Sequence, residues 1–301
     1  MNIKQWLKRI YKRFLVDHYP VLLIKKSWKS FTGKNLDLKN PQTLNEKIQW
    51  LICYSDTKEW TCLADKILVR DYVKACGLED ILVPVLGIWD DARKIDFDVL
   101  PSKFVLKCNH DSGSVIIVDK TKPYDKAFIV ESLNKALKHK YGYAHVEPHY
   151  NGIKPMILAE KFLDLDTSNI SSSAIDYKIF CYGGNPDIIW IAYNRHNGQY
   201  CNHQTRDLEW NRKYDYEADD PYYRLDDADI PRPKSLTRMI DAARRLSQGF
   251  PEVRVDFYDV NGMLFFGEMT FTSDCGRMPF FSDYYQKRAG DMIDLSLAKR
   301  K

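Results

Sequence analysis

Two runs of alternating residues flank Asn261-Gly262, within the stretch VRVDFYDVNGMLFFGEMTFTSD that spans residues 253–274. An Asn-Gly pair between such runs is a strong signal for a β-hairpin. Along the first run, apolar positions alternate with polar ones, and the second run places an acid and a hydroxyl among apolar residues. The polar positions are Arg254, Asp256, Tyr258, Glu268 and Thr270. The pattern predicts an antiparallel strand pair with one apolar face and one charged face.

The length of the turn decides which charged residues meet. A two-residue loop would pair Asp256 with Gly267 and turn Glu268 to the opposite face. A three-residue loop over 260–262, with its glycine in the left-handed position of a bulged turn, would pair Asp256 with Phe266. Asp256 and Glu268 would then share one face of the hairpin.

We expect the three-residue loop, because it also directs three large apolar side chains to the other face: Phe265, Met269 and Phe271. It places Arg254 opposite Glu268 and makes Asp256 and Glu268 diagonal neighbours, about 7–8 Å apart. Two carboxylates at that spacing can hold Mg²⁺ together with phosphate oxygens. The alternative is a solvated sheet face whose charges only keep the protein soluble.

Helix and strand signals are interspersed along the whole chain, without an internal repeat. Helices are predicted at 40–51, 64–77, 125–141, 235–250 and near the C-terminus. The helix at 40–51 carries a capping box formed by Thr43 and Glu46. Strands are predicted at 81–89, 104–107, 115–118, 154–163, 175–182 and 186–195, and a long loop region at 200–233. Interspersed helices and strands with hairpins predict an α+β fold rather than a doubly wound α/β fold.

The composition limits the class of protein. At 301 residues and 45% apolar content, the chain can bury a sizeable core. No apolar window is long enough to predict a transmembrane helix, and no signal peptide is predicted. The seven cysteines include no CxxC pair. The cysteine pattern predicts a reduced, cytoplasmic protein and does not indicate a structural zinc site.

The positive charge is concentrated at the N-terminus. Ten Lys/Arg against two Asp give residues 1–40 a charge of +8, so the rest of the chain carries −4 of the total of +4. Within residues 1–16, Ile3, Trp6, Leu7, Ile10, Tyr11, Phe14 and Leu15 recur at helical spacing beside basic residues. This basic amphipathic helix predicts binding to an anionic membrane surface. The alternative is a helix packed on the core, and nucleic acid is not an expected partner.

A small polar loop follows Lys107 and could turn backbone N–H groups toward an anion. Three other motifs are weaker. HVEPH at 145–149 has metal-like spacing, but Pro148 would disrupt a helix, so we read a loop. DFD at 96–98 and DLD at 164–166 resemble the acidic motif of nucleotide-sugar glycosyltransferases.

Several short motifs occur in an order that resembles an ATP-grasp enzyme: Lys66 in ADK, Lys107 in FVLK, AEKFL at 159–163, RVDF and GEMTF. More closely, five segments resemble the TupA-like ATP-grasp family of bacterial surface-polysaccharide loci: NPQTLNEKIQWL, DKILVRDYV, FVLKCNHDSG, DYKIFCYGG and GEMTFTSD. The resemblance covers residues 40–295. It implies an ATP-grasp fold in which two α+β lobes clasp ATP, preceded by the basic helix. The expected segments are 1–40, a first lobe at 41–157 and a second lobe with the hairpin at 158–301.

The resemblance also implies roles for individual residues. ATP would be bound by Lys66, Lys107, the loop residues Asp111, Ser112, Gly113 and Ser114, and the adenine hinge Glu160, Lys161, Phe162 and Leu163. Mg²⁺ would be held by Asp256, Glu268 and Thr270, and the catalytic residues would be Arg254, Lys178 and Arg195. Two positions depart from the superfamily. Thr270 stands where Asn is common, with Asp274 as a substitute ligand, and Asp111 stands where Gly would make the loop more pliable.

The implied activity is that of an ATP-dependent carboxylate–amine ligase that forms an amide through an acyl phosphate. The expected substrates are a sugar carboxylate of a glycan or lipid-linked precursor and an amino acid or other amine. The expected location is the cytoplasm, at the inner face of the membrane. Two alternatives stay open: a glycosyltransferase, and a non-catalytic ATP-binding assembly protein.

Overall fold

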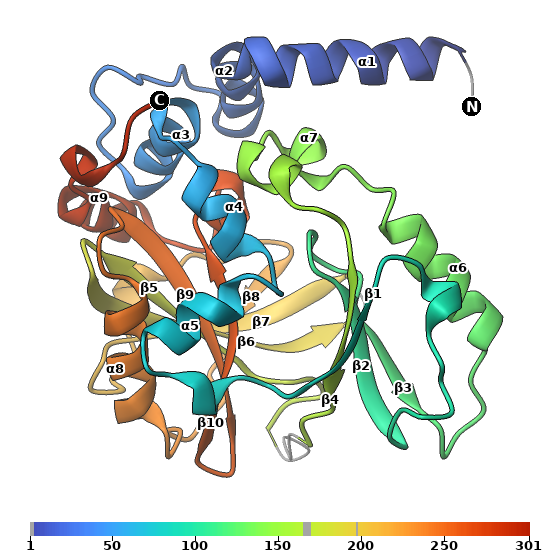
Figure 1. The fold of residues 1–301 in the computed structure, drawn as a ribbon. Coiled ribbons are helices and arrows are strands. Elements are labelled where there is room, and N and C mark those ends of the chain that lie inside the picture. Colours follow the sequence, from blue (N-terminus) through green and yellow to red (C-terminus); the bar gives the residue numbers. More distant parts are fainter. Residues whose placement is uncertain (1–2, 165–169, 197) are drawn as a thin grey trace.

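Two β-sheets form the framework of the chain, and helices surround them (Figure 1). The computed structural model describes residues 3–164, 170–196 and 198–301. The smaller sheet has four strands in the order β1-β4-β2-β3, and the larger has six in the order β10-β9-β5-β6-β7-β8. The predicted α+β class is confirmed, because the described residues interleave helices with two largely antiparallel sheets.

The four-stranded sheet is fully antiparallel and has its own core. Its strands are β1 (Val85–Trp89), β2 (Lys103–Cys108), β3 (Ile116–Asp119) and β4 (Ile157–Lys161). Along β2, buried Phe104 and Leu106 alternate with more exposed neighbours, as expected for a strand with one covered face. Helix α6 (Lys126–Ala136) covers that face and adds Ile129 and Leu133 to the same core cluster.

The six-stranded sheet contains the predicted hairpin at one edge. Its strands are β5 (Asp176–Tyr182), β6 (Asn185–His196), β7 (Tyr200–Arg206), β8 (Tyr223–Leu225), β9 (Glu252–Val260) and β10 (Met263–Thr270). All pairs are antiparallel except β7 with β8. Helix α8 (Leu236–Leu246) packs on β5, β6 and β9 through Met239, Ala243 and their apolar neighbours. Central strand β5 is buried along its whole length.

The remaining helices pack mainly around the six-stranded sheet. They are α1 (Ile3–His18), α2 (Pro20–Thr32), α3 (Leu44–Tyr54), α4 (Lys58–Ala64), α5 (Val69–Ala75), α7 (Tyr141–His145) and α9 (Asp283–Met292). The Thr43–Glu46 capping box that begins α3 is confirmed. Trp60 of α4 stacks on Phe271 just beyond β10, with ring centroids 5.1 Å apart. Helices early in the sequence therefore share a core with strands late in it.

Two features of the predicted layout differ from the structure. The region 200–233 is not a long loop, because it contains β7 and β8. The proposed boundary between residues 157 and 158 falls at the start of β4, which pairs within the four-stranded sheet. Residues 158–161 therefore belong to the smaller sheet, and the helices at 44–75 pack with the larger one.

The predicted three-residue turn of the hairpin is wrong. Val260 pairs with Met263, so Asn261 and Gly262 form a two-residue loop, and both have positive φ. An Asn-Gly pair is favoured in such a turn because both central residues need φ above zero. A β-bulge at Gly267 then shifts the register by one residue, since Phe266 pairs with Phe257 and Glu268 pairs with Asp256.

The bulge leaves the acidic residues on one face, although the turn differs from the prediction. Asp256 lies directly opposite Glu268, and Arg254 lies opposite Thr270 rather than opposite Glu268. Phe266, not Phe265, is the buried residue of the apolar face. Among the helices of the described residues, none combines the length and apolar character needed to cross a bilayer.

Candidate active site

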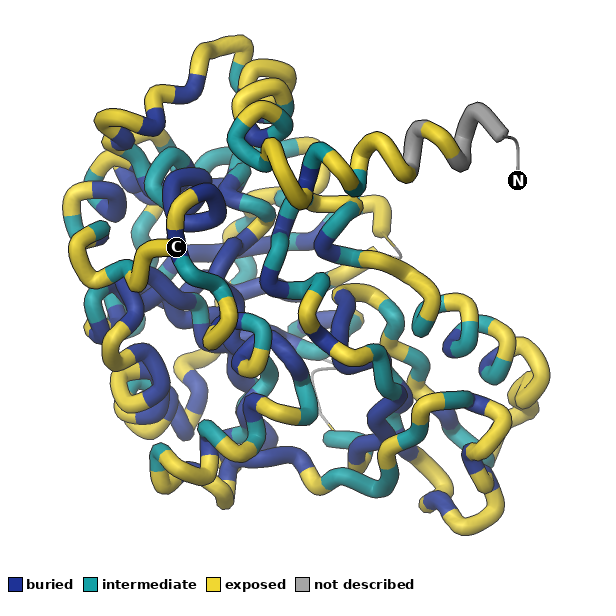
Figure 2. The backbone as a smooth tube through the Cα atoms, turned by 45° about the horizontal axis from the view of Figure 1, so that its top comes forward, coloured by how far each residue is buried: buried dark blue, intermediate teal, exposed yellow. Residues whose placement is uncertain are grey.

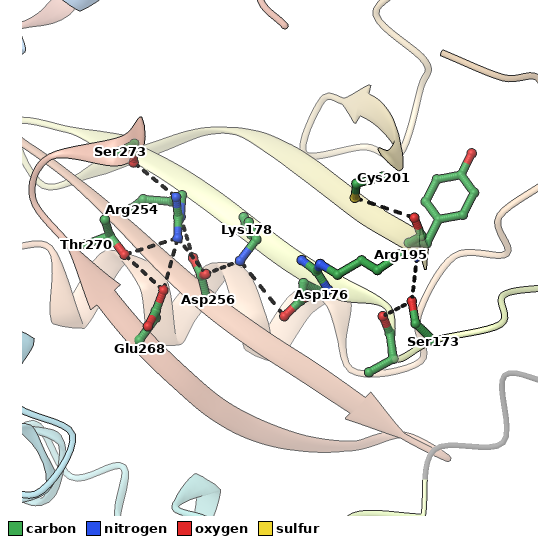
Figure 3. A network of polar contacts seen from close by, with 12 residues as sticks. Ser173, Asp176, Lys178, Arg195, Cys201, Arg254, Asp256, Glu268, Thr270 and Ser273 are labelled. Atoms are coloured by element: carbon green, nitrogen blue, oxygen red, sulfur yellow. Dashed lines mark hydrogen bonds and ion pairs between the residues drawn. The ribbon is translucent and has the colours of Figure 1, made fainter. Parts of the chain in front are cut away.

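Six charged side chains of alternating sign lie in line across the six-stranded sheet. We call them the ion-pair row, and its members are Glu268, Arg254, Asp256, Lys178, Asp176 and Arg195. They come from β10, β9, β5 and β6, and Figure 3 shows them pointing toward one another. On β5 they alternate with residues such as Cys181 that face α8, so the row lies on the other face of the sheet.

Arg254 connects the three residues predicted to bind magnesium. One of its nitrogens, Nη2, lies 2.8 Å from Asp256 Oδ2, 3.2 Å from Glu268 Oε1 and 3.1 Å from Thr270 Oγ1. Its Nε donates to Asp256 Oδ1 at 2.6 Å, and Nη1 donates to Ser273 at 3.3 Å. One oxygen from each predicted metal ligand therefore converges on a single positively charged group.

Asp256 is the most enclosed member of the row. Its side chain is 3% exposed, and Lys178 donates to it from the neighbouring strand. Burial alone would raise the pKa of this carboxyl, but Arg254 and Lys178 hold it below its ordinary value. Burial would lower the pKa of Arg254, and Asp256 with Glu268 reverses that effect and raises it. The carboxylate and the guanidinium each stay charged because the other is present.

The far end of the row pairs Asp176 with two cations. Lys178 Nζ lies 3.9 Å from Asp176, and Arg195 of β6 donates to the same carboxylate. The Arg195 side chain is 39% exposed, which makes it the most accessible cation of the row. Burial would lower the pKa of Arg195, and Asp176 raises it. Arg195 is thus a fixed positive charge with access to solvent.

The predicted phosphate-binding lysines lie on the opposing part of the molecule. Lys107 of β2 pairs with Glu160 of β4 at 2.6 Å, and Arg70 of α5 lies 3.8 Å from the same carboxylate. Lys66 precedes α5 and donates to the main-chain carbonyl of Asp111 at 2.6 Å. Burial lowers the pKa of Lys66, while the charge of Glu268 from the six-stranded sheet opposes that shift. Lys107 therefore belongs to the four-stranded sheet, while Lys66 bonds to the loop after β2 and also lies within reach of the charge of the hairpin residue Glu268.

The loop after β2 is held at its base and open at its tip. Asn109 is buried and bonds to Asp65, the Lys154 carbonyl and the Met156 N–H. The Asp111 carboxylate turns inward and accepts a hydrogen bond from Ser114. Ser112 and Gly113 are exposed at the tip, and Gly113 has φ of +100°. The negative charge of Asp111 is therefore directed into the base of the loop rather than out of its tip.

The residues of the predicted adenine hinge, 160–163, differ in how far they are buried. Glu160 is buried and paired with Lys107, whereas Lys161 is exposed and its N–H donates to the Pro84 carbonyl at 2.9 Å. Phe162 and Leu163 are partly buried, and Lys103 lies over the Phe162 ring at 5.2 Å. Glu160 acts in this structure as a partner for Lys107. Lys161 ends β4, and Phe162 and Leu163 continue beyond the strand.

The remaining motifs do not join this site. DFD forms a turn in which the Asp98 N–H donates to Asp96, while Phe97 is fully buried in the smaller core. DLD extends into 165–169, which lie outside the described residues. HVEPH is not a loop throughout, because His145 ends α7 and Pro148 begins a 3₁₀ helix over Pro148–Gly152.

Sequence reasoning missed three residues that complete the network. Asp176 links Lys178 to Arg195, Arg70 shares Glu160 with Lys107, and Ser273 contacts Arg254. Asp176 could have been found, since it is two residues from Lys178 on one strand and must share its face. Arg70 and Ser273 carry no such signal, because only the tertiary fold brings them to the site.

The donor set fits magnesium. Asp256 and Glu268 supply carboxylate oxygens and Thr270 supplies a hydroxyl, which are the oxygen ligands that Mg²⁺ prefers. Their convergence on Arg254 Nη2 indicates that all three can reach one cation. These three residues would hold the ion, and its charge would neutralise negative charge beside Arg254. Asp274 is exposed at the end of the hairpin segment and pairs with none of these three residues.

Comparisons with known proteins cover most of the chain. The profile of a family described as TupA-like ATPgrasp matches residues 46–294. No curated protein sequence matches the chain. Solved structures with weaker likeness include D-alanine–D-alanine ligase from Bacillus anthracis, with a TM-score of 0.45, 15% identity, and coverage of 80% of this chain and 68% of that chain.

Two further solved structures give similar values. D-alanine–D-alanine ligase from Helicobacter pylori has a TM-score of 0.41, 13% identity, and coverage of 77% of this chain and 61% of that chain. Phosphoribosylamine–glycine ligase from Thermotoga maritima has a TM-score of 0.38, 11% identity, and coverage of 70% and 49%. The alignments thus span about half to two thirds of these proteins. The family match includes the whole ion-pair row and both lysines of the opposing lobe.

Proposed function

This chain belongs to the TupA-like ATP-grasp family, and from that premise we propose that it is an ATP-dependent carboxylate–amine ligase. In the proposed reaction a carboxylate attacks the γ-phosphoryl group of ATP, giving an acyl phosphate and ADP. An amine then attacks the acyl carbon, phosphate leaves, and a C–N amide bond remains. We propose a sugar carboxylate of a capsular or other surface polysaccharide precursor as the acid, and an amino acid or another amine as the nucleophile.

The convergence of three oxygen ligands on Arg254 is the observation that supports this proposal most directly. Mg²⁺ held by Asp256, Glu268 and Thr270 would neutralise charge on the phosphate oxygens. Arg254, which lies among these three residues, would supply fixed positive charge to the reacting phosphoryl or acyl group. The reaction needs positioning and charge stabilisation rather than a protein nucleophile.

The other cations have complementary proposed roles. Lys66 and Lys107 bind phosphate oxygens of ATP from the opposing lobe, and the exposed loop tip at Ser112 and Gly113 closes over them. Residues 160–163 hold the adenine through their backbone. Lys178 keeps Asp256 ionised, and the accessible Arg195 binds a carboxylate of the substrate.

We also propose that the N-terminal helix holds the enzyme on an anionic membrane surface, at the cytoplasmic face where lipid-linked precursors are available. Four apolar side chains of α1 are exposed and recur at helical spacing: Leu7, Ile10, Tyr11 and Phe14. Figure 2 shows α1 extending outward from the rest of the molecule, with Leu7, Ile10, Tyr11 and Phe14 among its exposed residues. Basic residues flank the stripe in sequence, which suits anionic lipid.

Binding of Mg–ATP tests the proposed function first. The thermal unfolding of the full chain would be followed with ATP, ADP or nucleotide sugars, each with and without Mg²⁺. We expect a stabilising shift with Mg–ATP that Asp256→Asn abolishes, because this variant removes one ligand charge. Glu268→Gln, at a side chain that is 38% exposed, should weaken the shift while leaving the core intact.

Glu217→Gln is the matched control. Glu217 is also buried against an arginine, with Arg212 Nε at 2.9 Å, but it lies outside the ion-pair row. This variant should be destabilised and still respond to Mg–ATP. A positive result justifies a screen of acid–amine pairs for phosphate release. A shift with a nucleotide sugar alone would contradict the ligase and favour a glycosyltransferase. No shift would favour a scaffold.

A further inference from the structure

Three residues with metal-binding side chains meet outside the ion-pair row. His145 ends α7, Glu147 follows two residues later, and Cys275 lies in the 3₁₀ segment Ser273–Gly276. One ligand atom from each, an imidazole nitrogen, a carboxylate oxygen and the sulfur, lies within 4.8 Å of the other two. The fold brings them together from positions more than a hundred residues apart in the sequence.

Glu147 is the centre of the cluster. The residue is 3% exposed, and its Oε2 atom has no hydrogen-bond partner among the residues that the structure describes. Its other oxygen accepts a hydrogen bond from Thr272, which fixes the orientation of the carboxylate. A buried carboxylate oxygen without a partner is costly and calls for a proton or a cation.

The backbone on both sides of the cluster is held in an unusual conformation. Val146, between the two ligands of the first segment, has φ of +61°. Asp274 and Cys275 have φ of +46° and +53°. Left-handed φ is rare for residues other than glycine, and especially for β-branched valine. Such strain persists where the surroundings fix it, and it is concentrated at functional sites.

From this juxtaposition we propose that His145, Glu147 and Cys275 form a zinc-binding site. Imidazole, carboxylate and thiolate are all common ligands of Zn²⁺, whereas Mg²⁺ prefers oxygen ligands alone. Three protein ligands leave the fourth tetrahedral position to water or to a group of a bound substrate. Thr272 is the outer partner that orients Glu147, as such partners do in zinc sites. Binding releases the thiol proton of Cys275 to solvent.

The site lies close to the ion-pair row but does not share a ligand with it. Ser273, two residues before Cys275, contacts Arg254. Half-buried Tyr150 is subject to the charges of both Glu147 and Glu268. The zinc site is independent of the proposed ligase activity, because its ligands are not among those proposed for ATP or Mg²⁺.

Zinc binding to the full-length, tag-free chain tests the proposal without ATP. The protein is stripped with a chelator and titrated with Zn²⁺ against a chromophoric competitor, and Co²⁺ then serves as a spectroscopic probe. We expect one tight equivalent and a thiolate-to-cobalt charge-transfer band. Cys275→Ser should abolish the band, and His145→Ala should abolish the tight equivalent. Thr272→Val, which keeps all three ligands, should weaken binding roughly 10–100-fold.

Two controls separate this site from the rest of the molecule. Cys62→Ser removes an exposed thiol outside the cluster and should leave the tight equivalent unchanged. Asp256→Asn should also keep it, so loss of Mg–ATP binding and loss of zinc binding can be distinguished. Thermal melting of each metal-free variant identifies any that fails to fold. If a ligand variant does not fold, the zinc affinity of Thr272→Val decides the test. The proposal is overturned if the wild-type chain binds no Zn²⁺ ion tightly, or if Cys275→Ser still binds one tightly.

Discussion

At the scale of single residues, the contacts of Arg254 determine what the candidate site can do. Its Nη2 atom is bound by three oxygens, so a metal ion held by the same residues would have to compete with a positive charge that belongs to the protein. Of those three oxygens, the hydroxyl of Thr270 is the weakest ligand for Mg²⁺. Residue 270 is therefore the position at which a better oxygen ligand would add most to the proposed metal site.

Replacing Thr270 by asparagine should strengthen metal binding. The amide oxygen of Thr270→Asn is a better Mg²⁺ ligand than a hydroxyl, so we expect the Mg²⁺ concentration that half-saturates the ATP-dependent thermal shift to fall several-fold. Thr270→Val, which removes the hydroxyl at similar volume, should raise it. Equal Mg²⁺ dependence in the three proteins would show that residue 270 is not a ligand.

His203 should make the stability of the fold depend on pH. Burial lowers its pKa to about 4 from 6.5, and its Nδ1 accepts a hydrogen bond from the Trp190 indole at 3.0 Å. Below pH 6.5 the unfolded chain binds a proton here that the folded chain does not bind. Folding stability should therefore be lost as the pH falls from 6.5 to about 4, by up to about 3 kcal/mol.

Chemical denaturation across that pH range measures this loss. His203→Asn keeps an acceptor for Trp190 but cannot take up a proton, so its stability should fall less between pH 7 and 4 than that of the wild type. His196→Asn, at an exposed histidine, serves as the control and should retain the wild-type slope. An unchanged slope in His203→Asn would contradict the assignment.

At the scale of elements, the β-bulge of β10 positions the acidic residues. Without the extra residue at Gly267, the two-residue turn would direct Glu268 away from Asp256. A side chain at Gly267 would place its Cβ 3.0 Å from the Asp256 carbonyl oxygen. Contact between the two strands at this point is therefore tight enough to exclude a methyl group without a shift of the backbone.

Gly267→Ala should consequently separate the two proposed metal ligands. We expect a loss of about 1–3 kcal/mol in the free energy of unfolding, together with weaker Mg–ATP binding. Gly249→Ala is the control, since that glycine has positive φ but no atom of the described chain within 4 Å of its Cβ position. The control should lose stability and keep its Mg–ATP affinity. If both variants bind equally well, the bulge does not set the geometry of the site.

Sequence reasoning predicted most elements and the charged face of the hairpin, but not the register. Alternation of polar and apolar residues shows which side chains share a face of a strand. A bulge depends on how closely two backbones approach, and this distance cannot be predicted from residue types. Strand β7 was missed for a different reason. Its polar residues suggested a loop, yet His203 and Gln204 are buried and bonded to Trp190 and Tyr193. A polar strand that is buried has no apolar pattern to reveal it.

At the scale of the whole molecule, charge and exposed apolar surface are both concentrated in the N-terminal helices. The segment 1–40 carries +8 in an otherwise negative chain, and the stripe on α1 is exposed. Sequence periodicity identified this helix, but periodicity cannot distinguish an apolar face that packs on a core from one that faces solvent. The structure supplies that distinction for Leu7, Ile10, Tyr11 and Phe14.

Vesicle sedimentation tests the proposed membrane contact. We expect the full chain to bind vesicles of mixed neutral and anionic lipid and to be released by added salt, because exposed charges are screened. A triple change of Leu7, Ile10 and Phe14 to serine should abolish binding. Leu22→Ser, at an exposed apolar residue of α2, is the control and should bind as the wild type does. Binding that persists in the triple variant would exclude α1 as the anchor.

The alternating order of the ion-pair row has a kinetic consequence. The charges of the three acidic and three basic side chains offset one another. The row therefore produces only a weak electrostatic field beyond the Debye length, which is about 8 Å at physiological salt. An anionic nucleotide approaching from bulk solution is therefore not steered toward the sheet, and its encounter rate should vary little with ionic strength. At the proposed site, attraction would act only at short range, where the ligand exchanges partners with cations that are already paired. Ligands would then be discriminated by their dissociation rates rather than by their association rates.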